Sequence, residues 1–323
     1  MTQNLPYSAL VLSKEVDSVR KLTLLFAILL SLGLVFSSLA GCIESAETAN
    51  VPVDDLGRPV RIEEPAQTIV SLGPSITEIL FALDLGDRVV GVTDYCDYPE
   101  EAQSIAKVGA PFPGFSAETI LDLQPDLVLS LAGTVVQQME NVGVTVVVLH
   151  PTNIQGIYWD IELVGQLTGK EKEAETLVNS MKKRVEDVVA RTSMAIAKPT
   201  VFYEVDGSWN ENKPWTTGYA TFQDNLINLA GGVNIAAGRS GWYEMSIEEI
   251  LNVDPDVIIL EDYQFGVTPE ALMARSAWQG LGAVTDGRVY PIEDPNLTSR
   301  QGPRIVDGLE MLARMIHPEL FGE

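Results

Sequence analysis

The chain has 323 residues, 46% of them hydrophobic and 20% charged, a composition typical of a folded protein with about two domains. Its 45 Asp and Glu against 21 Lys and Arg give a formal net charge of −24, which argues against nucleic acid as a partner and against electrostatic docking to anionic lipid. Two cysteines and two histidines exclude a disulfide scaffold and the usual zinc clusters, so we expect no metal site and no cofactor.

The first 41 residues have the pattern of a lipoprotein signal peptide. An apolar run from Leu22 to Leu39 follows Arg20 and Lys21, which is the charge and hydropathy order of a secretory signal. The run ends in Leu-Ala-Gly-Cys, which resembles a lipobox and makes Cys42 the predicted lipidation site. A retained transmembrane helix is the alternative, because about 18 apolar residues are just long enough to span a bilayer.

Cleavage before Cys42 predicts an extracytoplasmic protein, in the periplasm or at the cell surface, whose acyl chains hold it on the membrane. Residues 42–56 would form the lipidated tether. The long stretch before the apolar run leaves open a start codon downstream of Met1.

Residues 57–156 alternate short apolar strands with helices, which is the pattern of βαβ units on a parallel sheet. After a strand-like opening at 57–62, the expected strands are 68–72, 88–93, 127–130 and 145–149, and the expected helices are 76–83, 117–123 and 135–142.

Residues 157–197 read as one long helical linker, weakly interrupted at 167–169 and carrying an apolar stripe between Ala174 and Val188. The βα alternation then resumes in residues 198–323. There we expect strands at 200–203, 257–260 and 289–292, and helices at 221–230, 246–251 and 303–316.

Two segments repeat each other at an offset of 130 residues. Residues 118–129 and 248–259 each combine a short helix, a Pro turn and a buried strand, with Pro125 and Pro255 in register. Two copies are too few for a solenoid. The sequence therefore predicts an α/β protein with two Rossmann-like lobes, each built on a central parallel sheet and joined by one long α-helix.

This organisation resembles the substrate-binding proteins of ABC importers, in the helical-linker class that captures cobalamin, ferric siderophores and haem. The motifs that carry the resemblance are SLGPSITE at 71–78, GVTDYCDYP at 91–99, SAETI at 116–120, SIEEI at 246–250 and RQGPR at 300–304. The stretch 94–99 is most similar to cobalamin-binding members. The resemblance implies a small metal chelate as ligand, cobalamin or a related corrinoid, and a membrane permease with its ATPase as partners. We expect a monomer.

The resemblance also assigns a docking role to one carboxylate in each lobe. Glu118 and Glu248 occupy equivalent positions of the repeat, and exposed carboxylates there would meet arginines of the permease. The alternative is that each only stabilises its helix dipole. Glu249 competes with Glu248 for the role in the second lobe.

The ligand should lie between the lobes, at the carboxyl ends of the strands. Aromatic faces suit a flat macrocycle, and a few polar groups can bond its side chains. The resemblance places Tyr95, a residue near Phe112, Trp215, Trp242 and Arg300 against the ligand. The complete predicted set, with three further residues that follow strands, is Pro74, Tyr95, Phe112, Trp215, Trp242, Tyr263, Asn296 and Arg300.

Other ligands and functions stay open at this point. Tyr95 or His150 could serve as an axial ligand of haem, and a ferric siderophore would require an arginine cluster that this acidic chain lacks. Cys96 is assigned no chemistry, because a lone Cys with no adjacent His usually packs as a small hydrophobic residue. No enzyme motif is present, so we expect no catalysis. A surface-anchored α/β hydrolase and a ligand-sensing adaptor are the alternatives of other classes.

Overall fold

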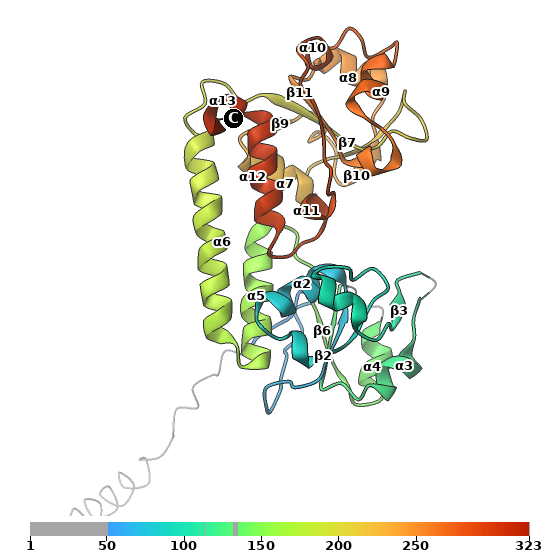
Figure 1. The fold of residues 1–323 in the computed structure, drawn as a ribbon, viewed down its shortest axis with the longest axis vertical. Helices are drawn as coiled ribbons and strands as arrows, with labels where there is room; N and C mark the ends of the chain where they lie inside the picture. The colour runs from blue at the N-terminus through green and yellow to red at the C-terminus, as the bar shows by residue number, and fades with distance from the viewer. Residues whose placement is uncertain (1–50, 113, 132–134, 323) are drawn as a thin grey trace, which may run out of the picture. The chain divides into compact units, whose positions relative to one another are not determined.

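The computed structural model describes residues 51–112, 114–131 and 135–322. The predicted signal peptide, Cys42 and the tether up to residue 50 lie outside the described residues. Residues Pro52–Glu323 form one compact unit, in which two sheets mark two lobes (Figure 1). No helix within the described ranges is long and apolar enough to cross a membrane.

The first sheet is parallel throughout, as expected. Its strands are β1 (Ile69–Leu72), β2 (Val89–Val92), β5 (Leu127–Ser130) and β6 (Thr145–Val148), in the order β2-β1-β5-β6. Helices α2 (Pro74–Ala82), α3 (Ala117–Asp122) and α4 (Val136–Glu140) follow the predicted positions. Burial on both faces explains why these strands are short continuous apolar runs.

Two short segments of the first lobe differ from the prediction. Strands β3 (Gly109–Ala110) and β4 (Gly114–Phe115) form a small hairpin. The strand expected at 57–62 reduces to a single bridge between Val53 and Pro59. The side chain of Asp54 accepts hydrogen bonds from the backbone and the guanidinium of Arg58, and this holds the segment in a turn.

The connecting segment consists of two helices instead of one continuous helix. Helix α5 (Ile154–Thr168) ends at Gly169, whose φ of 71° is the left-handed conformation that terminates helices. Helix α6 (Glu171–Thr192) then runs back along α5 (Figure 1). A Cβ atom at Gly165 would lie 2.6 Å from the Cβ of Ala174, so a glycine is required where the two helices meet. The interruption visible in the sequence is therefore a helical turn.

The second sheet is mixed, which corrects the expectation of a parallel sheet. Strands β7 (Thr200–Asp206), β11 (Val257–Leu260) and β12 (Val289–Pro291) are parallel, whereas β8 (Trp215–Thr217) and β10 (Trp242–Glu244) extend the sheet antiparallel. The order is β10-β8-β7-β11-β12, and β9 (Val233–Asn234) pairs with β7. The added strands are only three residues long, too short to show an alternating pattern.

Seven helices among the described residues accompany this sheet. The predicted ones are α7 (Phe222–Leu229), α8 (Ile247–Val253) and α12 (Ile305–Ile316). The others are short: α9 (Pro269–Ala274), α10 (Gly282–Thr285), α11 (Asn296–Ser299) and α13 (Pro318–Phe321).

One hydrophobic cluster runs through both lobes. It joins Ile76 and Leu80 of α2, Ile157 and Ile161 of α5, and Leu309 of α12 in a single set of buried contacts. Because such a close-packed core resists shear, the lobes should move little relative to each other. The domain boundaries predicted at residues 57, 157 and 198 remain predictions.

An ion cluster also connects the lobes. Glu78 of α2 has a side chain that is 2% exposed, and its carboxylate accepts from Arg304 Nε at 2.9 Å and Nη2 at 2.7 Å. Arg300 Nη1 donates to the same carboxylate at 3.1 Å and to Asp97 at 2.7 Å. Asp294 completes what we call the interlobe ion cluster through Arg304.

Removing Glu78 should destabilise the fold strongly. Glu78→Ala leaves two half-buried guanidinium groups without their shared partner, and we expect the free energy of unfolding to fall by about 3 kcal/mol. Urea denaturation of the full chain measures the loss. Glu63→Ala is the matched control, because Glu63 is exposed and unpaired among the described residues; equal effects of both variants would show that the cluster contributes little.

A buried acid lies on α5. Asp160 is 1% exposed, and neither of its carboxyl oxygens has a hydrogen-bond partner among the described residues. Burial, together with the neighbouring carboxylate of Asp55, raises the pKa of Asp160 from 3.8 to about 8. The folded protein therefore keeps this proton at neutral pH.

Replacing Asp160 by Asn should change how stability depends on pH. Between pH 4 and pH 8 the unfolded wild-type chain releases the Asp160 proton and the folded chain retains it, so wild-type stability falls as pH rises through this window. Asp160→Asn removes that loss and should be more stable than wild type at pH 8 by about 5 kcal/mol, but not at pH 4. Urea denaturation at both pH values tests this against Asp187→Asn, an exposed control; a pH-independent difference would contradict it.

Candidate ligand-binding site

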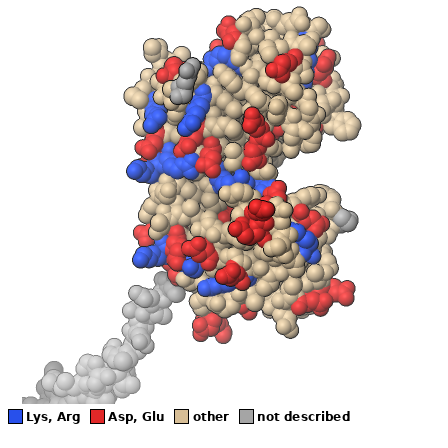
Figure 2. Space-filling view, viewed as in Figure 1, with Lys and Arg blue, Asp and Glu red and all other residues tan. Residues whose placement is uncertain are grey.

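The carboxyl ends of the first sheet face the second lobe. Arg300 of the second lobe donates to the carbonyl oxygen of Tyr95, two residues beyond Thr93, which directly follows β2. A Cβ atom at Gly302 would lie 3.2 Å from the carbonyl oxygen of Ser75, in the first turn of α2. Figure 2 shows the surface recessed between the lobes, beside a band of Lys and Arg, with Asp and Glu on both walls. This is the region where the ligand was predicted.

Four of the predicted aromatic side chains are exposed. The relative exposure is 58% for Tyr95, 86% for Phe112, 42% for Trp215 and 56% for Trp242. Burying such large apolar faces is favourable, so each is available to a ligand. Trp209, which was not in the predicted set, is 88% exposed in the loop after β7.

The antiparallel strands bring two of these aromatic residues together. Thr217 lies opposite Trp242 in the β8·β10 pair, and Trp215 lies opposite Glu244. Since side chains two residues apart share a face of the sheet, both indoles project from the same face. Trp215 and Trp242 are diagonal neighbours, and such positions in paired strands lie about 7–8 Å apart. The sequence predicted both residues but neither of the strands that pair them.

The remaining predicted ligand residues are partly buried. Pro74 is the first residue of α2, Tyr263 lies in the 3-10 turn Glu261–Phe265, and Asn296 begins α11. Their role in ligand binding stays a prediction.

Arginines near the site are already paired. Arg300 and Arg304 belong to the interlobe ion cluster, and Arg239 pairs with Glu249. Arg275 donates to both carboxylate oxygens of Glu204 at 3.0 Å. None of these four guanidinium groups is therefore free for an anionic ligand without breaking an existing ion pair.

Buried acids lie beneath the carboxyl ends of β7 and β11. Burial raises the pKa of Glu204 to about 7, although the pairing with Arg275 opposes the shift. Burial likewise raises the pKa of Glu261 to about 7 and raises that of Asp262. Glu261 and Asp262 were not singled out from sequence, although two acids directly after the apolar run of β11 were a visible signal. Because their pKa values are raised, these acids carry less negative charge near neutral pH than exposed carboxyl groups would.

The predicted docking carboxylates are exposed on equivalent helices. Glu118 follows the N-cap Ser116 of α3, and Glu248 follows the N-cap Ser246 of α8. Neither side chain has an ion-pair partner among the described residues. Glu249, by contrast, closes a capping box with Ser246 and bonds to Arg239. Glu248 is thus the carboxylate of α8 that is free to meet a partner.

Cys96 and His150 lie in unlike surroundings. Cys96 is 1% exposed, and its Sγ is 3.1 Å from the hydroxyl groups of Thr77 and Thr93. His150 is exposed, and its backbone N–H donates to Asp55. In the part of the chain that the structure describes, no group of three or more His, Cys, Asp and Glu residues is placed to hold a metal ion.

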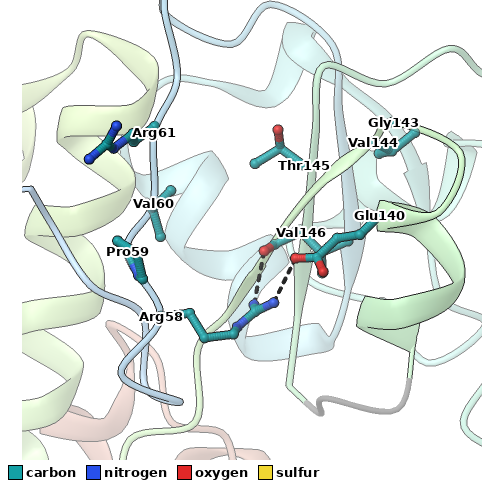
Figure 3. A pocket seen from close by; sticks show the side chains of 9 residues that line it. All are labelled: Arg58, Pro59, Val60, Arg61, Glu140, Gly143, Val144, Thr145 and Val146. Carbon is teal, nitrogen blue, oxygen red and sulfur yellow. Dashed lines mark hydrogen bonds and ion pairs between the residues drawn. The ribbon is translucent and has the colours of Figure 1, made fainter.

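A cavity in the first lobe lies away from this region. It has a volume of about 430 Å³ and is lined by the segment from Arg58 to Arg61, by Glu140 and by residues 143–146 (Figure 3). Arg58 crosses its floor to bond Glu140 and the carbonyl of Val146. The cavity opens at the amino end of β6, whereas the ligand site was predicted at the carboxyl ends of the strands.

Comparisons with known proteins agree with the fold. The family model described as "Periplasmic binding protein" matches residues 69–295. The uncharacterized ABC transporter substrate-binding lipoprotein YvrC of Bacillus subtilis (strain 168) is 37% identical over 290 residues, which cover 87% of this chain and 90% of that relative. The vitamin B12-binding protein of Yersinia pestis (strain Pestoides F) is 30% identical over 206 residues, 62% of this chain and 71% of that protein.

A solved structure extends the comparison to the tertiary level. The periplasmic heme-binding protein RhuT from Roseiflexus sp. RS-1, in its apo form, superimposes with a TM-score of 0.69 at 25% identity, covering 78% of this chain and 98% of that chain. The two-lobed fold and the family resemblance predicted from the motifs are therefore confirmed: the chain belongs to the periplasmic binding protein family.

Proposed function

We propose that this protein is the substrate-binding lipoprotein of an ABC importer and that it captures cobalamin or a related corrinoid between its lobes. The observation that carries the choice of ligand is the pairing of every arginine near the site with a carboxylate, beside several exposed aromatic side chains. A large, neutral, amide-rich macrocycle needs aromatic faces and hydrogen bonds, but no free cation.

Charge separates the ligand candidates where similarity does not. One relative is a B12-binding protein and a structural neighbour is a heme-binding protein, so both ligands are represented among similar proteins. Ferric siderophores and haem carry anionic groups, and none of the four guanidinium groups near the site is free to pair with them. Burying an unpaired negative charge is unfavourable. An uncharged corrinoid avoids that cost.

Haem is the second candidate, on one specific observation. Tyr95 is 58% exposed, and the phenol oxygen of tyrosine is a known type of ligand for haem iron. For the hydrolase alternative there is no support: no Ser, Thr or Cys side chain of the described residues is hydrogen-bonded to His150 or His317.

The membrane attachment belongs to the same proposal. The lipobox-like sequence at Cys42 supports a lipid anchor on the outer side of the cytoplasmic membrane. The name of the relative YvrC, a lipoprotein, supports the same reading. Binding and delivery to a permease require no catalysis by this chain.

Titration of the full chain in detergent tests the ligand. We expect saturable one-to-one binding of cyanocobalamin by calorimetry, with weaker or no binding of haemin. Trp215→Ala and Trp242→Ala should each weaken cobalamin binding about tenfold, because each removes a stacking face.

Trp159→Phe is the matched control, since Trp159 is also exposed but lies on α5 of the helical hairpin. Preferential binding of haemin would replace cobalamin by the second candidate. Failure to bind either compound would refute the proposed ligand class.

The docking role of the two free glutamates has its own test. Glu118→Arg with Glu248→Arg should abolish ligand-dependent uptake into vesicles that carry the cognate permease and ATPase, because like charges would then meet at the interface. Ligand affinity should not change. Glu175→Arg with Asp187→Arg is the control, as both residues are exposed and unpaired on α6; normal uptake by the Glu118 and Glu248 double variant would exclude them from docking.

A further inference from the structure

We propose that Asp97 is a positioning residue for ligand binding, because together with Arg300 it holds the loop Tyr95–Pro99 in the conformation that presents Tyr95. The inference rests on the proposed function and deepens it, since it adds to the site a residue that does not itself touch the ligand. It also changes the role of Arg300 from a ligand contact to a support of the loop.

The loop is fixed from the second lobe at three points. Arg300 Nη1 donates to Asp97 Oδ1 at 2.7 Å, and its Nη2 donates to the carbonyl oxygen of Tyr95 at 3.5 Å. Arg304 stacks on Tyr98, with the guanidinium carbon 3.8 Å from the ring centroid. Two arginines therefore span the whole loop.

The first lobe fixes the same loop from below. Cys96 lies in the hydrophobic core, and its carbonyl oxygen accepts from Lys107 Nζ at 3.3 Å. With Cys96 buried, its neighbours Tyr95 and Asp97 both point outward, and each is 58% exposed. The loop is thus held by the buried Cys96, and the direction of the exposed Tyr95 side chain depends on the contacts of the residues on either side of Cys96.

Asp97 makes the contact that can be removed selectively. Arg300 is shared between Glu78, which is 2% exposed, and Asp97. If Asp97 is lost, Arg300 still has Glu78, and Arg304 still makes its two bonds to Glu78. The lobes stay connected while the loop loses its strongest tie to the second lobe.

The expected effect is on affinity and not on stability. An exposed ion pair contributes little to folding, so Asp97→Asn should leave the thermal midpoint unchanged. A mobile Tyr95 must be immobilised when the ligand binds, and ordering one such side chain weakens binding about three- to tenfold. Because the loss comes from a less ordered site, the dissociation rate should rise accordingly.

The experiment measures cyanocobalamin affinity, dissociation rate and thermal midpoint for the full chain in detergent. Glu100→Gln is the matched control: Glu100 is exposed, unpaired among the described residues and three positions further along, so it removes the same charge from the same region. We expect weaker binding for Asp97→Asn and wild-type binding for Glu100→Gln. Equal affinities for Asp97→Asn and wild type would overturn the proposal.

A double-mutant cycle separates positioning from direct contact. If Asp97 acts through Arg300, the variant with both Asp97→Asn and Arg300→Gln should bind no more weakly than Arg300→Gln alone. If the two effects add, Asp97 touches the ligand and the proposal is wrong. If wild type binds haemin instead, the same cycle is run with haemin; binding of neither compound refutes the proposed ligand class and this inference with it.

Discussion

The buried carboxylate of Glu78 is neutralised by two arginines that lie more than 220 positions away in the sequence. A charge in this position is costly unless it is paired, so the two lobes must meet where Arg300 and Arg304 can reach α2. This constraint fixes which edges of the two sheets face each other. It also pairs the guanidinium groups of Arg300 and Arg304, so they are not free to bind an anionic ligand between the lobes.

The hydrophobic core and the helical hairpin act in the same direction. One buried cluster contains residues of α2, α5 and α12, and α6 lies along both α5 and α12. Close-packed interiors transmit strain and do not deform smoothly. A receptor of this construction has to hold its ligand-binding groups in place before the ligand binds. The contacts that support a single loop, such as Tyr95–Pro99, therefore matter for ligand affinity.

Each lobe contributes groups of a different kind. The first lobe offers Tyr95 on a loop held between a buried cysteine and an arginine. The second offers Trp215 and Trp242 on paired strands, near acids whose pKa values burial raises to about 7. Aromatic faces over a weakly polar floor suit a large uncharged ligand, and they put the recognition in shape and stacking more than in ion pairs.

Sequence by itself determined the elements whose signal is local. Continuous apolar runs predicted β1, β5, β6 and β11, and the repeat at an offset of 130 residues predicted two related lobes. The helices expected at 117–123 and 246–251 are α3 and α8. Only the tertiary structure decided the contacts between distant segments. The sequence singled out Arg300 but could not show that it bonds Glu78. Trp215 and Trp242 became neighbours only through strands that are too short to show a periodic pattern. Gly169 divided one expected helix into two. Pairing partners, register and burial depend on what the rest of the chain brings to a residue, and a local pattern does not contain that information.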